Sequence, residues 1–496
     1  MTLGKSLLLG SAAALCAAVS AQAADLPVRK AAPVDYVRVC DFTGAGFFYI
    51  PGTDTCMQVG GILRTEFDFI NNSRAFFPQA VTGTGVGSTN NTNRGNTIPA
   101  GTLIPGRDRD ETGFFARARL SIDTRTQTAY GVLRAFLQFQ ADRLQGIYSG
   151  GGPAGGANSF ANQGGNNVQL RRGFIQFAGI TAGRVQSFFD FYADNYNYEG
   201  IAGSDTNINV FAYTYTVGGG FSATLSMEDR TGRNLPQNLG NILGGPSALV
   251  SAARYAGETI PDIVGVLRYD QPWGAAQLSA AYHEIQSTEG PFPGTGNQGI
   301  GTADTNGFAV QGGVRIKLPM LAAGDDLWLE GTYQQGAYFY QDSGTFLNGG
   351  FSSLAVGGFQ HIDRDAIAIH TPGTPAAAYS LQKGEGFSAL AAFNHYFTPN
   401  FHDVLFGSYE QTSYGRAGNI DWTLGGLGDG SEYRVGNQFL WDPVKNLEFG
   451  LEFTYMHIDQ TLAHNPGQTA TSIAGLRGVA QNPDAFEVRL RAERDF

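Results

Sequence analysis

The chain has 496 residues and a formal net charge of −11, from 43 acidic and 32 basic side chains. This acidic balance argues against nucleic acid as a partner. Hydrophobic residues make up 42% of the chain, and no apolar run reaches the roughly 20 residues of a membrane-spanning helix, which excludes a helical membrane protein. A membrane β-barrel is not excluded, because its alternating strands give no hydropathy peak.

The first residues predict export. Lys5 precedes an apolar run at 7–19, and the small-residue pattern Ala21-Gln22-Ala23 follows. A basic start, a short apolar core and an A-x-A site are typical of a secretory signal peptide, here residues 1–23. A lipoprotein anchored through Cys16 is the alternative, but Leu15 directly before this cysteine fits that processing site poorly.

Two cysteines, Cys40 and Cys56, remain after removal of the signal. An even pair in an oxidising compartment predicts a disulfide. Closing a loop of about 15 residues contributes about 3 kcal/mol by the chain-entropy estimate. Two cysteines without nearby histidines do not complete a tetrahedral zinc site.

From residue 57 onward, apolar and polar residues alternate with a period of two, which is typical of strands with one apolar and one ionic face. In the segment FFARARLSIDTR, for example, Phe114 and Leu120 face one way, while Arg117, Arg119 and Asp123 face the other. Sixteen strands are predicted, at residues 57–70, 114–127, 129–143, 168–178, 180–189, 209–218, 220–229, 262–271, 275–287, 306–318, 326–341, 385–398, 401–413, 431–441, 446–459 and 485–496.

Short and long connections alternate along the chain, and the long ones are rich in Gly, Asn, Pro and Ser. This rhythm predicts an all-β fold: a 16-stranded antiparallel transmembrane β-barrel over residues 57–496, with short periplasmic turns and long extracellular loops. Residues 24–56 then form a periplasmic lead. A soluble β-sandwich of this length would show several domains with linkers, and a solenoid would show a fixed repeat.

The final strand, AFEVRLRAERDF at 485–496, fits a barrel that closes. Its apolar side would face lipid and its ionic side the water inside. Closure leaves no unpaired strand edge in hydrocarbon.

The stretch VRVCDFTGAGFFYIPGTDTCMQVGGILRTEF at 37–67, together with ADLPVRKAAP before it, resembles the alphaproteobacterial porin family, the general porins of Brucella- and rhizobium-type outer membranes. The resemblance implies a homotrimer in the outer membrane, with each water-filled pore narrowed by its third extracellular loop folded inward. It also implies that Phe496 is the signal recognised by the barrel-assembly machinery. Long loops 1, 4 and 6 depart from a compact porin.

The third loop, counted along the chain, covers about residues 190–209. It carries four acids and no Lys or Arg, and the preceding strands carry arginines on their polar side. An acidic loop against a basic wall would create a transverse field at the narrowest point of a pore. The plainer interpretation is that the acids solvate an external loop. The predicted constriction consists of Asp190, Asp194, Glu199 and Asp205 on the loop, with Arg117, Arg119, Arg134, Arg172 and Arg184 on the wall.

Strict alternation allows only one of the neighbours Arg171 and Arg172 to face inward, and we assign Arg172 to the wall.

The sequence therefore predicts a passive diffusion channel for small hydrophilic solutes and ions, without catalysis, metal or cofactor. The seven histidines have no ligand spacing, and neither a G-x-S-x-G elbow nor a P-loop occurs. A substrate-specific uptake channel and a barrel enzyme are the alternatives. Ion preference stays open, because the acidic total favours cations and an arginine-lined throat favours anions. Acids in the long loops could bridge to lipopolysaccharide through divalent cations.

Overall fold

The structure is a computed structural model that describes residues 38–71, 74–77, 102–105, 112–146, 165–233, 253–255, 257–289, 301–342, 365–370, 379–415, 426–463 and 484–496. The chain divides into two compact units, Met1–Cys56 and Met57–Phe496. The predicted signal peptide and most of long loops 1, 4 and 6 lie outside the described residues.

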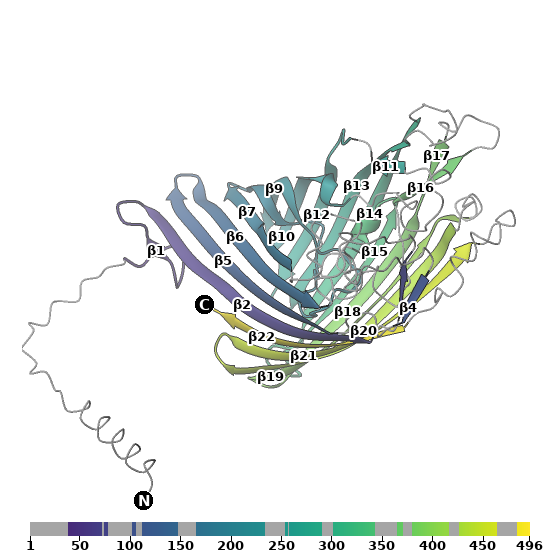
Figure 1. Ribbon diagram of the computed structural model, residues 1–496. Helices are drawn as coiled ribbons and strands as arrows, with labels where there is room; N and C mark the ends of the chain where they lie inside the picture. Colours follow the sequence, from purple (N-terminus) through teal and green to yellow (C-terminus); the bar gives the residue numbers. More distant parts are fainter. Residues whose placement is uncertain are drawn as a thin grey trace, which may run out of the picture. The chain divides into compact units, whose positions relative to one another are not determined.

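Within the described residues, sixteen antiparallel strands pair in chain order and close into a ring, as predicted (Figure 1). They are β2 (Thr55–Asn71), β5 (Thr112–Thr128), β6 (Gly131–Gly146), β7 (Gly165–Phe177), β8 (Ile180–Gln186), β9 (Asn207–Gly218), β10 (Phe221–Glu228), β12 (Asp262–Gln271), β13 (Gly274–Glu289), β14 (Gly301–Lys317), β15 (Asp326–Gln335), β18 (Glu385–Thr398), β19 (Phe401–Ser413), β20 (Gly426–Val444), β21 (Leu447–Ala463) and β22 (Asp484–Asp495).

Short additional elements accompany the ring. They are β1 (Phe48–Tyr49), the pair β3 (Arg74–Phe77) and β4 (Thr102–Pro105), β11 (Ala253–Tyr255), the pair β16 (Ala366–His370) and β17 (Tyr379–Lys383), and the 3-10 turns η4 (Arg230–Gly232) and η5 (Tyr338–Tyr340). In the part of the chain that the structure describes, no helix has the length and apolar character needed to cross a membrane.

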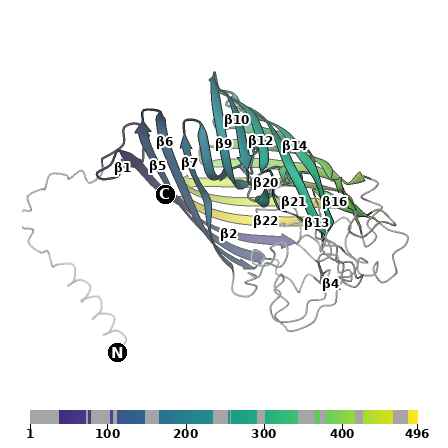
Figure 2. The same ribbon diagram turned by 90° about the horizontal axis from the view of Figure 1, so that it is seen from above.

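The ring closes between β2 and β22, which lie side by side in Figure 2. Their ladder runs from Ile62↔Asp495 to Asn71↔Phe486. Beyond it, Gly61 and Phe496 exchange two backbone hydrogen bonds of 3.0 Å. A Cβ on Gly61 would lie 2.2 Å from the carbonyl oxygen of Arg119, so only glycine fits at this approach.

Two-residue turns join many strand pairs at one rim. Residues 178–179 connect β7 to β8, and 219–220 connect β9 to β10, in both cases with two successive positive φ angles. This backbone geometry is that of the turns that match the twist of paired strands. Short turns at one end are typical of outer-membrane barrels, where they lie on the periplasmic side, so this rim corresponds to the side on which the sequence predicts periplasmic turns.

Side chains alternate between the two faces of the wall. On β19, Leu405 and Tyr409 are exposed on the outside, whereas Val404 and Phe406 are buried inside. The interior wall also carries buried charges, among them Glu452 and Arg489. An apolar exterior with an ionic interior is the pattern of a barrel that stands in lipid and encloses water.

Two predicted strands are shorter than expected. The strand predicted at 326–341 ends at Gln335, because Gly336 takes a positive φ and the chain turns into η5, where Tyr338 and Tyr340 are buried. The strand predicted at 180–189 ends at Gln186. The loop that follows therefore begins at residue 187, within the range predicted as strand.

The described part of the first unit, residues 38–56, is held by the predicted disulfide between Cys40 and Cys56. Phe47 packs against both cysteines, and the N–H of Cys40 donates to the carbonyl of Phe47 at 3.1 Å. The guanidinium of Arg38 lies 4.4 Å from the ring centre of Tyr49. These contacts make the segment a small cross-linked unit of its own.

Candidate functional site

The chain between β8 and β9, residues 187–206 and here called loop 3, contacts wall strands far from its own. The N–H of Tyr192 donates to Glu330 on β15 at 2.8 Å, and that of Ala202 to Ser408 on β19 at 3.1 Å. The N–H groups of Tyr198 and Glu199 donate to the two carboxylate oxygens of Glu452 on β21 at 2.6 and 2.8 Å. Loop 3 therefore crosses the interior of the barrel.

These contacts explain how an irregular segment can be buried. Buried backbone N–H and C=O groups need partners, and loop 3 has no ladder of its own. On β13, the amide of Gln277 donates to the carbonyls of residues 188–190 at 3.1–3.3 Å, and the hydroxyl of Ser279 donates to that of Phe189 at 3.0 Å. Polar side chains of the wall replace the missing ladder.

Glu199 is fully buried and anchors the middle of loop 3. Its Oε2 accepts from Arg489 on β22 at 2.6 Å, and its Oε1 accepts from Arg434 on β20 at 3.3 Å. The same arginines also donate to loop carbonyls, those of Tyr198 and Gly200, each at 2.7 Å. This predicted constriction acid is consequently neutralised by the wall, and it does not face open solvent.

Asp190 lies near the start of loop 3 and binds residues near its end. It accepts hydrogen bonds from the N–H of Thr206 at 2.7 Å and from the side chains of Ser204 and Gln186. Burial raises the pKa of Asp190 to about 7, and the positive charge of Arg233 opposes this rise. The carboxyl therefore titrates near neutral pH.

Asp194 stabilises the loop from within. Its Oδ1 accepts from the amide of Asn197 at 2.7 Å and from the N–H of Ile201 at 3.3 Å. Burial raises its pKa well above the ordinary value, and the charge of Asp205 adds to the rise. Like Glu199, Asp194 stabilises the conformation of loop 3.

Asp205 interacts with the arginines of β7. It accepts from Gln186 at 2.8 Å, is partly exposed, and interacts electrostatically with Arg171 and Arg172. The structure thus brings Asp190 and Asp205 together at Gln186, whereas Glu199 is bound by Arg434 and Arg489.

Arg117 and Arg119 lie on the inner face of β5. Arg117 forms a two-pronged ion pair with Asp142 on β6, at 2.8 and 3.1 Å. Arg119 donates to the neutral amide oxygen of Gln140 at 2.7 Å. Because Gln140 carries no charge, Arg119 keeps its positive charge less compensated than Arg117 does.

Arg134 belongs to a separate group near the turn rim. It donates to Asp123 at 3.0–3.2 Å, and Arg125 binds the same carboxylate at 2.9 Å. Its guanidinium lies 5.3 Å from the ring centres of Phe136 and Phe174. Along β5, Arg125 lies about 20 Å from Arg119. This group is therefore closer to the turn rim than Arg119 is.

A β-bulge changes the prediction for Arg171. Gln138 of β6 pairs with Arg172 and the next residue, Phe139, pairs with Leu170, so Arg171 is the extra residue. It interacts electrostatically with Arg119 and Arg117 on the inner face. Both neighbours therefore contribute to the inner basic surface, because a bulge suspends the alternation on which the choice of one rested.

Arg172 connects the end of β7 to the base of loop 3. It donates to Asn207 at 2.8 Å and to Gln186 at 2.9 Å. Gln186 also donates to Asp205 at 2.8 Å. A single amide thus links the basic wall to the acidic loop.

Arg184 is not brought together with the other arginines. The ladder places it opposite Asn209, on the same face as the exposed Phe211 and Tyr213. Asp229 is its electrostatic neighbour there. The register therefore assigns Arg184 to the outer face.

The anchoring residues Arg434, Arg489, Glu330 and Glu452 were not predicted as site residues. A further inner group joins β2 to β22, where Arg491 donates to Glu66 at 2.7 Å and lies 3.4 Å from the ring centre of Tyr198. Arg64 of β2 pairs with Glu493. The ionic face of the final strand was visible in the sequence, but its partners in loop 3 were not.

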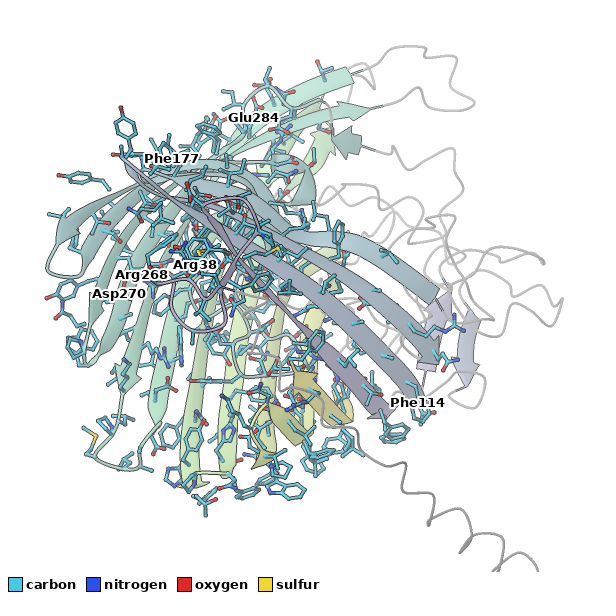
Figure 3. All side chains as sticks on the ribbon, turned by 90° about the vertical axis from the view of Figure 1, so that its left-hand side faces the viewer. Arg38, Phe114, Phe177, Arg268, Asp270 and Glu284 are labelled. Atoms are coloured by element: carbon cyan, nitrogen blue, oxygen red, sulfur yellow. A yellow bond between two sulfur atoms is a disulfide. The ribbon has the colours of Figure 1, made fainter. Side chains whose placement is uncertain are left out.

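Aromatic side chains fill the space beside loop 3. Phe191, Tyr192 and Tyr196 surround Trp328, with ring centres 5.0, 5.7 and 6.5 Å away. Trp328 is 7% exposed and packs inside the barrel. Arg268, labelled beside its ion-pair partner Asp270 in Figure 3, lies 5.6 Å from the ring centre of Phe191.

Among the described residues, no group of three or more His, Cys, Asp or Glu side chains is placed to hold a metal ion.

Comparison with known proteins agrees with this geometry. Residues 25–476 match the family described as Porin subfamily. The chain is 32% identical over 298 residues to porin Omp2b of Brucella suis, covering 57% of this chain and 66% of the relative. It is also 32% identical over 286 residues to porin Omp2b of Brucella abortus (strain 2308), with the same coverage. The match thus spans slightly less than two thirds of these relatives.

Among solved structures, the outer membrane channel DcaP of Acinetobacter baumannii has a TM-score of 0.53 at 12% identity. The superposition covers 90% of this chain and 99% of that one. At this identity the likeness concerns the fold.

Proposed function

The chain belongs to the porin subfamily, and from this premise we propose that it forms a water-filled passive diffusion channel for small hydrophilic solutes and ions in the bacterial outer membrane. The observation that carries the proposal is loop 3, which wall side chains hold inside a closed barrel. A loop fixed in the lumen would narrow the path that solutes take through the barrel. Charged groups on both sides of such a path act on every solute that passes.

The constriction has a reduced set of effective charges. On the loop, the charge of Glu199 is neutralised by two arginines, and the carboxylate of Asp194 accepts hydrogen bonds within the loop. Asp205 and, at alkaline pH, Asp190 supply the negative side. Arg117, Arg119, Arg171 and Arg172 supply the positive side, with Arg117 partly offset by Asp142.

This balance favours anions. Arg119 and Arg171 lie close enough to interact, and neither forms an ion pair among the described residues. Positive charge that is only partly compensated in a narrow passage raises the local concentration of anions. We therefore expect the positive charge at the proposed constriction, and not the net negative charge of the whole chain, to determine the ion preference.

Further parts of the proposal rest on the sequence and on the resemblance to the family. Residues 1–23 are the signal peptide, 24–56 a periplasmic lead closed by the disulfide, and 57–496 the barrel. Three copies associate into a homotrimer, and Phe496 is the signal for the barrel-assembly machinery. The proposed bridging of lipopolysaccharide by divalent cations involves long loops that lie mostly outside the described residues.

Reconstitution into a planar bilayer tests the function. Stepwise currents that grow linearly with voltage in simple salt support a general pore. Saturation of the current by one solute would favour a substrate-specific uptake channel. Correctly folded trimers that carry no current would contradict both.

A further inference from the structure

The outer face of the barrel carries a groove across β15, β18, β19 and β20, with a volume of about 490 Å³. Small residues line it, namely Ala389 and Ala391 on β18 and Gly407 on β19. Larger apolar side chains border it, namely Leu327, Phe393, Leu405 and Val435. Leu405 and Val435 are 54% and 51% exposed, which shows that the groove opens to the outside.

The groove lies in the membrane-facing surface. Odd-numbered residues of β19 point outward, because Leu405 and Tyr409 are exposed while Val404 and Phe406 are buried against the interior. Ala391, Gly407 and Val435 are partners in neighbouring ladders, so they form one row across three strands. An apolar depression at this position faces lipid chains.

Polar residues lie directly below the groove on the same outward face. Along β19, Asp403 is the next outward residue after Leu405, and the ladders place it between His395 on β18 and Phe439 on β20. Asn437 donates to Oδ1 of Asp403 at 2.8 Å. His395 bonds instead to Asp325, at 2.7 Å. In the described part of the wall no cationic side chain forms an ion pair with Asp403.

The depth of Asp403 matches the headgroup region. It lies two residues from Phe401, where β19 begins at the turn rim, and about 13 Å along the strand from Gly407. Phe397 and Phe401 have ring centres 5.8 Å apart, and Phe401 stacks with Phe439 at 6.5 Å. Such aromatic rings lie at the level of the lipid headgroups.

We propose that this surface is a binding site for a phospholipid of the periplasmic leaflet with an ammonium headgroup, such as phosphatidylethanolamine. One acyl chain occupies the groove over Ala391 and Gly407, and the ammonium group pairs with the carboxylate of Asp403. Asn437 fixes that carboxylate by its hydrogen bond and leaves the second oxygen for the lipid. The proposal assumes that the barrel spans a membrane and does not depend on conduction through the pore.

Native mass spectrometry of the full chain in mild detergent tests the site. Phosphatidylethanolamine and phosphatidylglycerol with identical acyl chains are added in parallel, and the retained lipid is counted. We expect the wild type to retain more phosphatidylethanolamine. Asp403→Asn should lower that retention about fivefold, the size expected for one partly exposed ion pair, and leave phosphatidylglycerol unchanged. Ala391→Phe should lower the retention of both lipids, because the ring fills the groove.

Two matched controls are available on the outer face. Glu385→Gln removes a carboxylate from the opposite end of β18, and Ala118→Phe adds a ring to the outer face of β5. Neither should change lipid retention. Bilayer currents through each variant report folding independently.

Several results would overturn the proposal. Equal retention of the two lipids by the wild type, or no loss in Asp403→Asn, would remove the headgroup site. A change of subunit number in Ala391→Phe without loss of lipid would assign the groove to contact between copies. Loss of current in the wild type would contradict the channel and leave the lipid result intact.

Discussion

Arg489 on β22 donates a 2.6 Å hydrogen bond to Glu199 in loop 3, across 290 residues of sequence. Both side chains are buried, and Arg434 completes the ion group at Glu199. The contact joins the segment that narrows the lumen to the strand that closes the wall.

Replacing Glu199 by Gln should loosen loop 3. The change leaves Arg434 and Arg489 buried with less compensation, and breaking a buried ion pair on one side costs about 3–5 kcal/mol. We expect a lower thermal unfolding midpoint and larger current fluctuations in the bilayer. Asp270→Asn is the control, because its pair with Arg268 is exposed and such pairs contribute about 0–1 kcal/mol. Equal effects of the two changes would argue against the anchor.

Reversal of charge at the wall should change ion preference. Replacing Arg117 and Arg119 by Glu is expected to move the reversal potential in a salt gradient toward cations. Arg171→Gln should move it in the same direction by a smaller amount. Arg184→Gln should leave it unchanged, since that residue lies on the outer face. An unchanged potential in the double variant would mean that these side chains do not line the narrowing.

Selectivity should depend on pH through Asp190. The pKa of its carboxyl is about 7, so raising the pH from 6 to 8 adds a negative charge to the loop and should increase cation permeability. In Asp190→Asn this part of the pH dependence should disappear. Reversal potentials measured between pH 5 and 9 in both proteins decide the matter.

The same shift has a consequence for stability. The ordinary pKa of 3.8 lies below the folded value, so the folded state holds this proton more tightly than the unfolded state does. The contribution to the free energy of unfolding is fully present below pH 3.8 and is lost as the pH rises through 7. Asp190→Asn should therefore flatten the decline of the unfolding midpoint over this range.

Removing the disulfide should affect only the first unit. In the double variant Cys40→Ser, Cys56→Ser, the segment loses the roughly 3 kcal/mol expected for closing a loop of this length. We expect faster tryptic cleavage at Arg38. Because the barrel forms a separate compact unit, its unfolding midpoint should not change. A matching fall of that midpoint would contradict this separation.

The sequence was sufficient for the barrel, because most strands carry their own alternation, and the regular change between short and long connections supports the strands that alternate poorly, at 262–271 and 401–413. The functional site was harder to predict from the sequence than the fold was. Glu199 and Asp205 look alike in the sequence, and only the distant arginines on β20 and β22 separate their roles. The inward side of Arg171 depends on a bulge, and the side of Arg184 on the register of a short strand; neither leaves a local signal.

The partners of loop 3 also bear on the order of folding. Glu452 and Arg489 lie more than 250 residues beyond the loop, and contacts between such distant segments form slowly because a long stretch of chain must be brought together first. The aperture can reach its final width only after β21 and β22 have joined the wall. A barrel interrupted before that step would lack these anchors, so the width of its aperture would not yet be fixed.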